Sequence, residues 1–266
     1  MIGWLTFMTE MISSLSLVCE MKYGNPDQMG WSPLQRRKYN YHTPDDYYEA
    51  KLLSVIKPDT NWLDVGCGRD IFPSNIPLAK TLSERCSLLV GLDPGDNIDL
   101  NPFVHEKHKC FIEDFKTDHR FDVISLRMVA EHIAKPEAAV SALGQLIKPG
   151  GIVIIYTVNK RSPSSLIAAM TPMAVHHTVK RLLWDGREED TFPTTYLMNT
   201  RYELKTLFEH HGFFEHDFVY LDDCRSFQKW PLTSLTELII WKALSSLGLC
   251  YPENCLLGTY TMPVTT

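Results

Sequence analysis

Short apolar runs of strand length alternate with amphipathic segments through the middle of the chain. These runs cover residues 62–65, 87–92, 121–126 and 152–157. Between them, residues 76–85 and 136–147 place their apolar side chains on one face of a helix. A further short strand is expected over 110–112, and a turn over 148–151. The alternation predicts a parallel sheet that is covered by helices on both faces.

The first twenty residues are mostly apolar. They lack a basic start, and Glu10 interrupts them, which argues against a signal peptide and against a membrane span. Two interpretations stay open: an amphipathic helix that covers a core or a partner, or an extension ahead of Met21. We expect residues 1–43 to form an N-terminal extension and lid, and residues 44–266 to form the main domain.

The regular alternation of strands and helices stops after residue 158. Two short helical patterns, over 164–170 and 173–184, are separated by Pro172. We expect residues 160–200 to be an inserted substrate cap at the ligand-binding end of the sheet. The elements expected after it are a helix over 201–210, a strand over 213–221, an apolar helix over 232–247 and a strand over 256–262.

Charge and cysteine usage restrict the partners and the compartment. The 266 residues carry a formal net charge of −6 and no Lys/Arg-rich run, which argues against a nucleic-acid partner. The seven cysteines are scattered without a Cys-x-x-Cys pair, so free thiols in a reducing, cytoplasmic setting are expected. The apolar face of the helix over 232–247 suggests a homodimer contact.

A glycine loop follows the first central strand. The sequence Gly66-Cys67-Gly68 allows positive φ angles and close approach of a ligand to the backbone. A dinucleotide site would require a third small residue, because the pyrophosphate must meet the helix N-terminus, and Arg69 and Asp70 stand there instead. Asp64, two residues before the loop, is better placed for a cationic ligand.

The stretch from Leu63 to Gly68 resembles motif I of the class I S-adenosylmethionine-dependent methyltransferases. Four further segments match the family in order: Asp93 at the end of 89–93, Glu113-Asp114, the stretch 121–132, and the stretch 146–151. The resemblance implies a Rossmann-like α/β fold, a mostly parallel seven-stranded sheet flanked by helices, with a helical substrate cap. It also implies S-adenosylmethionine as cofactor and S-adenosylhomocysteine as product.

The resemblance assigns roles to particular residues. Asp93 matches the acid that holds both ribose hydroxyls, and Glu113-Asp114 matches the acidic pair near the adenine amino group. The residues expected to bind the cofactor are Asp64, Gly66, Cys67, Gly68, Asp93, Pro94, Glu113, Asp114, Arg127 and Met128. Some relatives use a Glu-x-x-Glu-His metal cluster after the fourth strand, but Met128 replaces its first carboxylate here, so no metal is expected.

Methyl transfer requires a base only if the acceptor must lose a proton, and histidine is the usual base near neutral pH. The candidates are His132, just past the fourth strand, and His176 and His177 in the insertion. Tyr156 and Asp222 are the next candidates.

The expected acceptor is a small molecule, methylated at a hydroxyl or carboxylate oxygen. The alternatives are an N-methyltransferase, a protein methyltransferase, or a catalytically silent cofactor-binding subunit. Segments 159–161, 192–196 and 220–223 are similar to a bacterial-type group of methyltransferases, and this similarity does not name a substrate.

Overall fold

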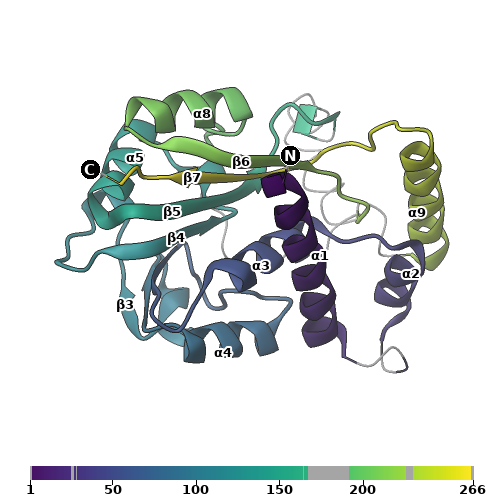
Figure 1. Cartoon of the computed structure of the whole chain (residues 1–266), viewed down its shortest axis with the longest axis horizontal. Coiled ribbons are helices and arrows are strands. Elements are labelled where there is room, and N and C mark those ends of the chain that lie inside the picture. Colours follow the sequence, from purple (N-terminus) through teal and green to yellow (C-terminus); the bar gives the residue numbers. More distant parts are fainter. Residues whose placement is uncertain are drawn as a thin grey trace.

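The computed structural model describes residues 2–24, 27, 29–163, 165–166, 192–225 and 230–264, with the backbone alone for residues 2–12. Its centre is a seven-stranded sheet with the order β3-β2-β1-β4-β5-β7-β6 (Figure 1). All neighbouring pairs from β3 to β5 are parallel, and β7 runs antiparallel to both β5 and β6. The strands are β1 Asn61–Val65, β2 Leu88–Leu92, β3 Glu106–His108, β4 Phe121–Arg127, β5 Ile147–Val158, β6 Phe214–Leu221 and β7 Cys255–Thr261.

Two helical layers cover the sheet, and each encloses its own apolar core. The elements α1 Ile2–Tyr23, α3 Pro44–Val55 and α4 Ile76–Arg85 contribute to one core, which includes Trp62 and Phe72. The helices α5 Pro136–Leu146 and α8 Arg201–His210 enclose the other. The helices α2 Trp31–Tyr39 and α9 Pro231–Ser246 contact each other beyond the carboxyl ends of the strands (Figure 1).

Local sequence explains where the helices of the first layer begin. Thr43 accepts a hydrogen bond from Asp46 N while Asp46 accepts one from Thr43 N, so a capping box opens α3. The Asn75 side chain caps α4 by accepting a hydrogen bond from Leu78 N. These caps satisfy backbone donors that would otherwise have no partner at a helix start.

The apolar N-terminal segment forms α1, which packs on α3 and α4. Leu15 and Val18 are buried in the core on this side of the sheet. The ammonium of Lys22 lies 2.9 Å from a carboxylate oxygen of Asp46 and 3.0 Å from one of Glu49. These contacts favour the interpretation of this segment as a helix that covers the core. In the part of the chain described here, no helix is both long and apolar enough to cross a membrane.

Two local expectations are wrong. The third strand is Glu106–His108 and not 110–112, where a 3₁₀ turn begins at Ile112. This strand lies at the sheet edge and is half exposed, so polar residues form it and no apolar run marks it. The expected turn over 148–151 is a bulge inside β5, because Ile147 pairs with Phe121 and Ile152 already pairs with Val123. The predicted helices over 164–170 and 173–184 lie outside the described residues, apart from Ser165 and Leu166.

Candidate functional site

The glycine loop leaves the carboxyl end of β1 in a conformation that requires glycine. Gly66 and Gly68 have φ angles of +72° and +46°. The backbone N–H groups of Gly66 and Cys67 both donate to the carbonyl of Leu92, at 2.7 and 3.1 Å. A Cβ on Gly66 would lie 2.2 Å from Cγ2 of Val129. The loop is therefore held between the ends of β2 and β4.

Asp93 follows β2 and joins the glycine loop to the next turn. One carboxylate oxygen accepts a hydrogen bond from Gly68 N at 3.0 Å, and the other accepts one from Gly95 N at 2.7 Å. Each carboxylate oxygen has room for a second donor. Pro94 lies between the two anchored positions and is half-buried. The arrangement can present a fixed carboxylate to a pair of adjacent hydroxyls.

Asp64 lies on β1 beneath the loop and is buried. Its carboxylate accepts a hydrogen bond from the Ser125 hydroxyl at 2.5 Å, and Ser125 Oγ accepts one from Trp62 Nε1 at 2.7 Å. Burial raises the pKa of Asp64 to about 7, although the Ser125 hydroxyl and Arg127 oppose the rise. A cation bound nearby would favour the ionised carboxylate.

Arg127 and Met128 lie where β4 ends. Arg127 donates to Asp45 Oδ1 at 3.2 Å, and Arg225 binds the other oxygen of the same carboxylate. Burial alone would raise the pKa of Asp45, but these two guanidinium groups lower it to about 2. Met128 has a φ of +53° and donates its N–H to Tyr156 O at 2.7 Å. This network ties the start of α3 and the segment after β6 to the end of β4.

The acidic pair predicted to face adenine lies in the 3₁₀ turn η3 Ile112–Asp114. Glu113 is half-buried and Asp114 is exposed, and Asp114 N donates to Phe111 O at 3.1 Å. No contact in the described structure joins either carboxylate to the glycine loop or to Asp93. Their role at the adenine stays a prediction.

His132 lies in the 3₁₀ turn η4 Ala130–His132 after β4. Its Nδ1 is 3.3 Å from the carbonyl oxygen of Pro193. A carbonyl can only accept, so this contact places the proton on Nδ1 and leaves Nε2 with a free lone pair in the neutral ring. The neighbouring Glu131 is buried and accepts a hydrogen bond from Thr157 Oγ1 at 2.7 Å. His132 is therefore oriented as a base that would act through Nε2.

The loop residues fit S-adenosylmethionine. A Cβ built on Gly68 would meet no neighbouring heavy atom closer than Asp93 Oδ2, at 3.9 Å, so there is room for a ligand above the loop. Asp93 would hold the ribose hydroxyls, and Asp64 would face the cationic methionine end. Tyr48 is fully buried beside the same carboxylate, since both Asp64 and the Ser125 hydroxyl influence the pKa of its phenol.

A profile of the methyltransferase domain family matches residues 36–214. The chain belongs to this family. The order of strands and membership of this family confirm the predicted class I methyltransferase fold. Membership of this family also confirms the prediction of S-adenosylmethionine as the cofactor.

Curated relatives of this methyltransferase domain include ubiquinone biosynthesis O-methyltransferases. The protein from Citrobacter koseri is 29% identical over 141 residues, which cover 44% of this chain and 54% of the relative. The one from Neisseria meningitidis serogroup A is 33% identical over 116 residues, with 39% and 46% covered. The chain therefore spans about half the length of the curated relatives it matches.

Solved structures agree with the fold of the methyltransferase domain. The methyltransferase bound to the Trm112 activator from Haloferax volcanii superposes with a TM-score of 0.55 at 12% identity, covering 86% of this chain and 93% of that one. An S-adenosylmethionine dependent methyltransferase of Listeria monocytogenes gives 0.51 at 14% identity, with 82% and 98% covered. At these identities the likeness shows the fold alone.

The other residues predicted as bases are either outside the described residues or already hydrogen-bonded. His176 and His177 lie outside the described residues. Tyr156 is fully buried, its hydroxyl donates to Cys255 Sγ at 3.8 Å, and burial raises its pKa well above the usual value. Asp222 accepts a hydrogen bond from the Trp241 indole, and burial raises its pKa. Of the predicted bases described, His132 is the one in the turn after β4, where its backbone N–H donates to Val129 O at 2.9 Å and Val129 lies against Gly66.

Sequence reasoning missed Asn101, whose side chain binds the backbone of the glycine loop. Its amide donates to the carbonyls of Cys67 and Gly68, at 3.3 and 3.1 Å, and the side chain is fully buried. Nothing in its local sequence marks this role, because the loop it supports is 33 residues away. Ser125 was missed for the same reason, since only the pairing of β1 with β4 brings it to Asp64.

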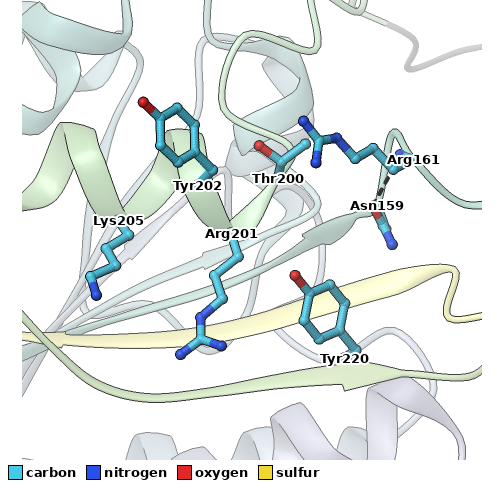
Figure 2. A pocket seen from close by; sticks show the side chains of 7 residues that line it. All are labelled: Asn159, Arg161, Thr200, Arg201, Tyr202, Lys205 and Tyr220. Carbon is cyan, nitrogen blue, oxygen red and sulfur yellow. Dashed lines mark hydrogen bonds between the residues drawn. The ribbon is translucent and has the colours of Figure 1, made fainter.

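The described residues also line two cavities away from the glycine loop. A cavity of about 330 Å³ lies at the root of the insertion (Figure 2), lined by Asn159, Arg161, Thr200, Arg201, Tyr202, Lys205 and Tyr220. A larger cavity of about 910 Å³ lies between α1, α2 and the start of α3. Its polar lining includes Cys19, whose Sγ is 3.4 Å from His42 Nδ1. Both volumes are in the range of small-molecule sites.

Proposed function

We propose that this methyltransferase domain transfers the methyl group of S-adenosylmethionine to an oxygen atom of a small molecule, with His132 as the general base. The observation that carries the proposal is the hydrogen bond between His132 Nδ1 and the Pro193 carbonyl. It leaves the basic nitrogen Nε2 unused at the carboxyl edge of the sheet, where ligands of open α/β folds bind.

Asp93, Asp64 and His132 have separate roles in the proposed reaction. Bound adenosylmethionine would supply an electrophilic methyl carbon, from which the sulfur would leave as the neutral thioether of adenosylhomocysteine. Asp93 holds the ribose through its two remaining acceptor positions, and the ionised Asp64 balances positive charge on the methionine end. His132 accepts the hydroxyl proton of the acceptor at Nε2 while that oxygen forms its bond to carbon. The imidazolium then donates hydrogen bonds from both nitrogens, and Pro193 O still accepts one of them.

Oxygen is the proposed acceptor atom because the matched relatives are named O-methyltransferases. An oriented neutral imidazole also suits a hydroxyl, which must lose a proton, whereas a carboxylate needs no base. Residues 160–200 are proposed to close over the acceptor as an inserted cap, and residues 1–43 as a lid. The rival proposals are N-methylation, protein methylation and a silent cofactor-binding subunit.

Methyl transfer from labelled adenosylmethionine to a panel of acceptors tests the proposal. The panel contains phenols and catechols, carboxylic acids, amines and an unfolded protein. We expect turnover with hydroxyl acceptors, and His132→Gln should lose about 10²–10⁴-fold in kcat while adenosylhomocysteine affinity stays within twofold. His119→Gln is the matched control, because His119 is exposed and lies just before the amino end of β4, whereas His132 follows its carboxyl end.

Other outcomes would select a rival. Amine or protein acceptors alone would replace the oxygen proposal, and adenosylhomocysteine binding without any turnover would favour the silent subunit. Full activity of His132→Gln on a hydroxyl acceptor would remove His132 as the base. Binding of NAD in place of adenosylhomocysteine would refute the cofactor assignment.

A further inference from the structure

A five-residue segment, 192–196, crosses from the loop after β2 to the turn after β4, and we call it the strap. At one end, Cζ of Phe192 lies 3.9 Å from the position that a Cβ would occupy on Gly95. Gly95 N is one of the two donors that fix the Asp93 carboxylate. The strap therefore begins against the turn that carries the proposed ribose-binding acid.

The other end of the strap is fixed to η4. Thr195 N donates to Glu131 O at 2.7 Å, and Thr195 Oγ1 donates to Ile133 O at 2.8 Å. Tyr196 N also donates to Glu131 O, at 3.2 Å, and Tyr196 has a φ of +51°. Lys160 Nζ donates to the carbonyl of Tyr196 at 3.0 Å. A residue other than glycine adopts such a positive φ only at an energetic cost. The hydrogen bonds just described hold the backbone of the strap in this conformation.

Phe192 is the first residue of the strap and is not buried. Its side chain stays 42% exposed, although the backbone one to four residues further on is anchored by several hydrogen bonds. An aromatic ring at the edge of a ligand loop and open to solvent has an apolar face available for a bound molecule. With the ribose on Asp93, the adenosine of a bound cofactor would present a sugar and a flat base next to this ring.

We propose that Phe192 is a cofactor-positioning residue, which packs against the adenosine of the bound cofactor and thereby holds the strap over the site. This rests on the proposed function, since it takes Asp93 as the ribose acid and His132 as the base. The next residue along the strap, Pro193, supplies the carbonyl that fixes His132. A cofactor contact at Phe192 therefore also fixes the orientation of the base.

The first test is cofactor affinity, measured by calorimetric titration with adenosylhomocysteine. Phe192→Ala should raise the dissociation constant about tenfold through loss of apolar contact, and should raise the KM for adenosylmethionine without changing the KM for the acceptor. Phe192→Gln gives the same readout if the alanine variant is unstable. Phe214→Ala is the matched control, because Phe214 is 63% exposed at the start of β6, and it should bind as the wild type does.

The second test follows His132 directly by the NMR resonance of its ring proton on Cε1, assigned with His132→Gln. Saturating adenosylhomocysteine should shift this resonance in the wild type and in Phe214→Ala, but not in Phe192→Ala. An unchanged dissociation constant for Phe192→Ala, or a wild-type shift in that variant at saturation, would overturn the inference. Either result leaves the proposed function intact, because that is judged by turnover of the wild type and His132→Gln.

Discussion

Asp45 is the residue whose replacement tests the architecture of the site most directly. It is 7% exposed and binds two guanidinium groups, one from β4 and one from the segment after β6. Replacement by Asn keeps the shape but removes the negative charge. Arg225 would retain Asp223, at 2.7 and 2.8 Å, whereas Arg127 would lose the carboxylate it binds. We expect Asp45→Asn to leave one partly buried positive charge without compensation.

The magnitude follows from the pKa of the carboxyl group. A fall from 3.8 to about 2 corresponds to about 2 kcal/mol of stability from Asp45 at neutral pH. The folded-state pKa is the lower one, so this contribution is fully present above the unfolded value and is lost as the pH falls toward 2. At pH 3, midway through that window, about 1 kcal/mol remains.

Urea unfolding of the wild type and Asp45→Asn at pH 7 and pH 3 measures both quantities. We expect the variant to be about 2–3 kcal/mol less stable at pH 7, since the arginine side chains are still 24–27% exposed and the loss should stay below the range for fully buried pairs. The difference in unfolding free energy between the wild type and Asp45→Asn should be smaller by about 1 kcal/mol at pH 3. Asp99→Asn, which breaks an exposed pair with Lys109, is the control and should change stability by less than about 1 kcal/mol.

Two results would refute this reasoning. One is a stability of Asp45→Asn within 0.5 kcal/mol of the wild type at pH 7, about the scale of a neutral surface change. The other is a stability difference between the wild type and Asp45→Asn that does not change with pH. Such a result would mean that the variant loses stability through altered packing and not through the carboxylate charge. A double-mutant cycle with Arg127→Gln separates these cases, because a coupling energy near zero identifies altered packing.

Three further predictions concern cofactor binding. Gly66→Ala should destabilise the fold by several kcal/mol and abolish binding, because the new methyl group would meet Val129 at 2.2 Å in a left-handed conformation; a variant that melts normally would contradict this. Asp93→Ala should weaken adenosylhomocysteine binding by about 1.5–3 kcal/mol in calorimetric titration, and an unchanged affinity would remove Asp93 from the site. Adenosylmethionine affinity should rise between pH 6 and pH 8 as Asp64, with its pKa of about 7, ionises. Asp64→Asn should abolish that rise, and Ser125→Ala should move it to higher pH.

Some features of this protein are set by residues that are close together in sequence. The caps at Thr43 and Asn75 act on backbone groups three residues away, so their effect can be predicted without the fold. The glycine loop requires positive φ angles within the loop itself, and the apolar runs of β1, β2, β4 and β5 reflect their burial between two helical layers. These signals were sufficient to predict the sheet and the glycine loop, and the family was predicted from the resemblance of the sequence motifs to the class I methyltransferases.

The rest depends on which strands become neighbours, and no local pattern encodes that. Asp45 binds Arg127 and Arg225 across 82 and 180 residues. The strap reaches η4 and the turn at Gly95 only after the chain has crossed the sheet. Buried polar groups must find partners wherever the packing places them, because leaving one without a partner costs more free energy than a typical hydrogen bond contributes. The sequence alone therefore determined where the cofactor loop lies, and only the tertiary structure decided which side chains hold that loop and orient His132.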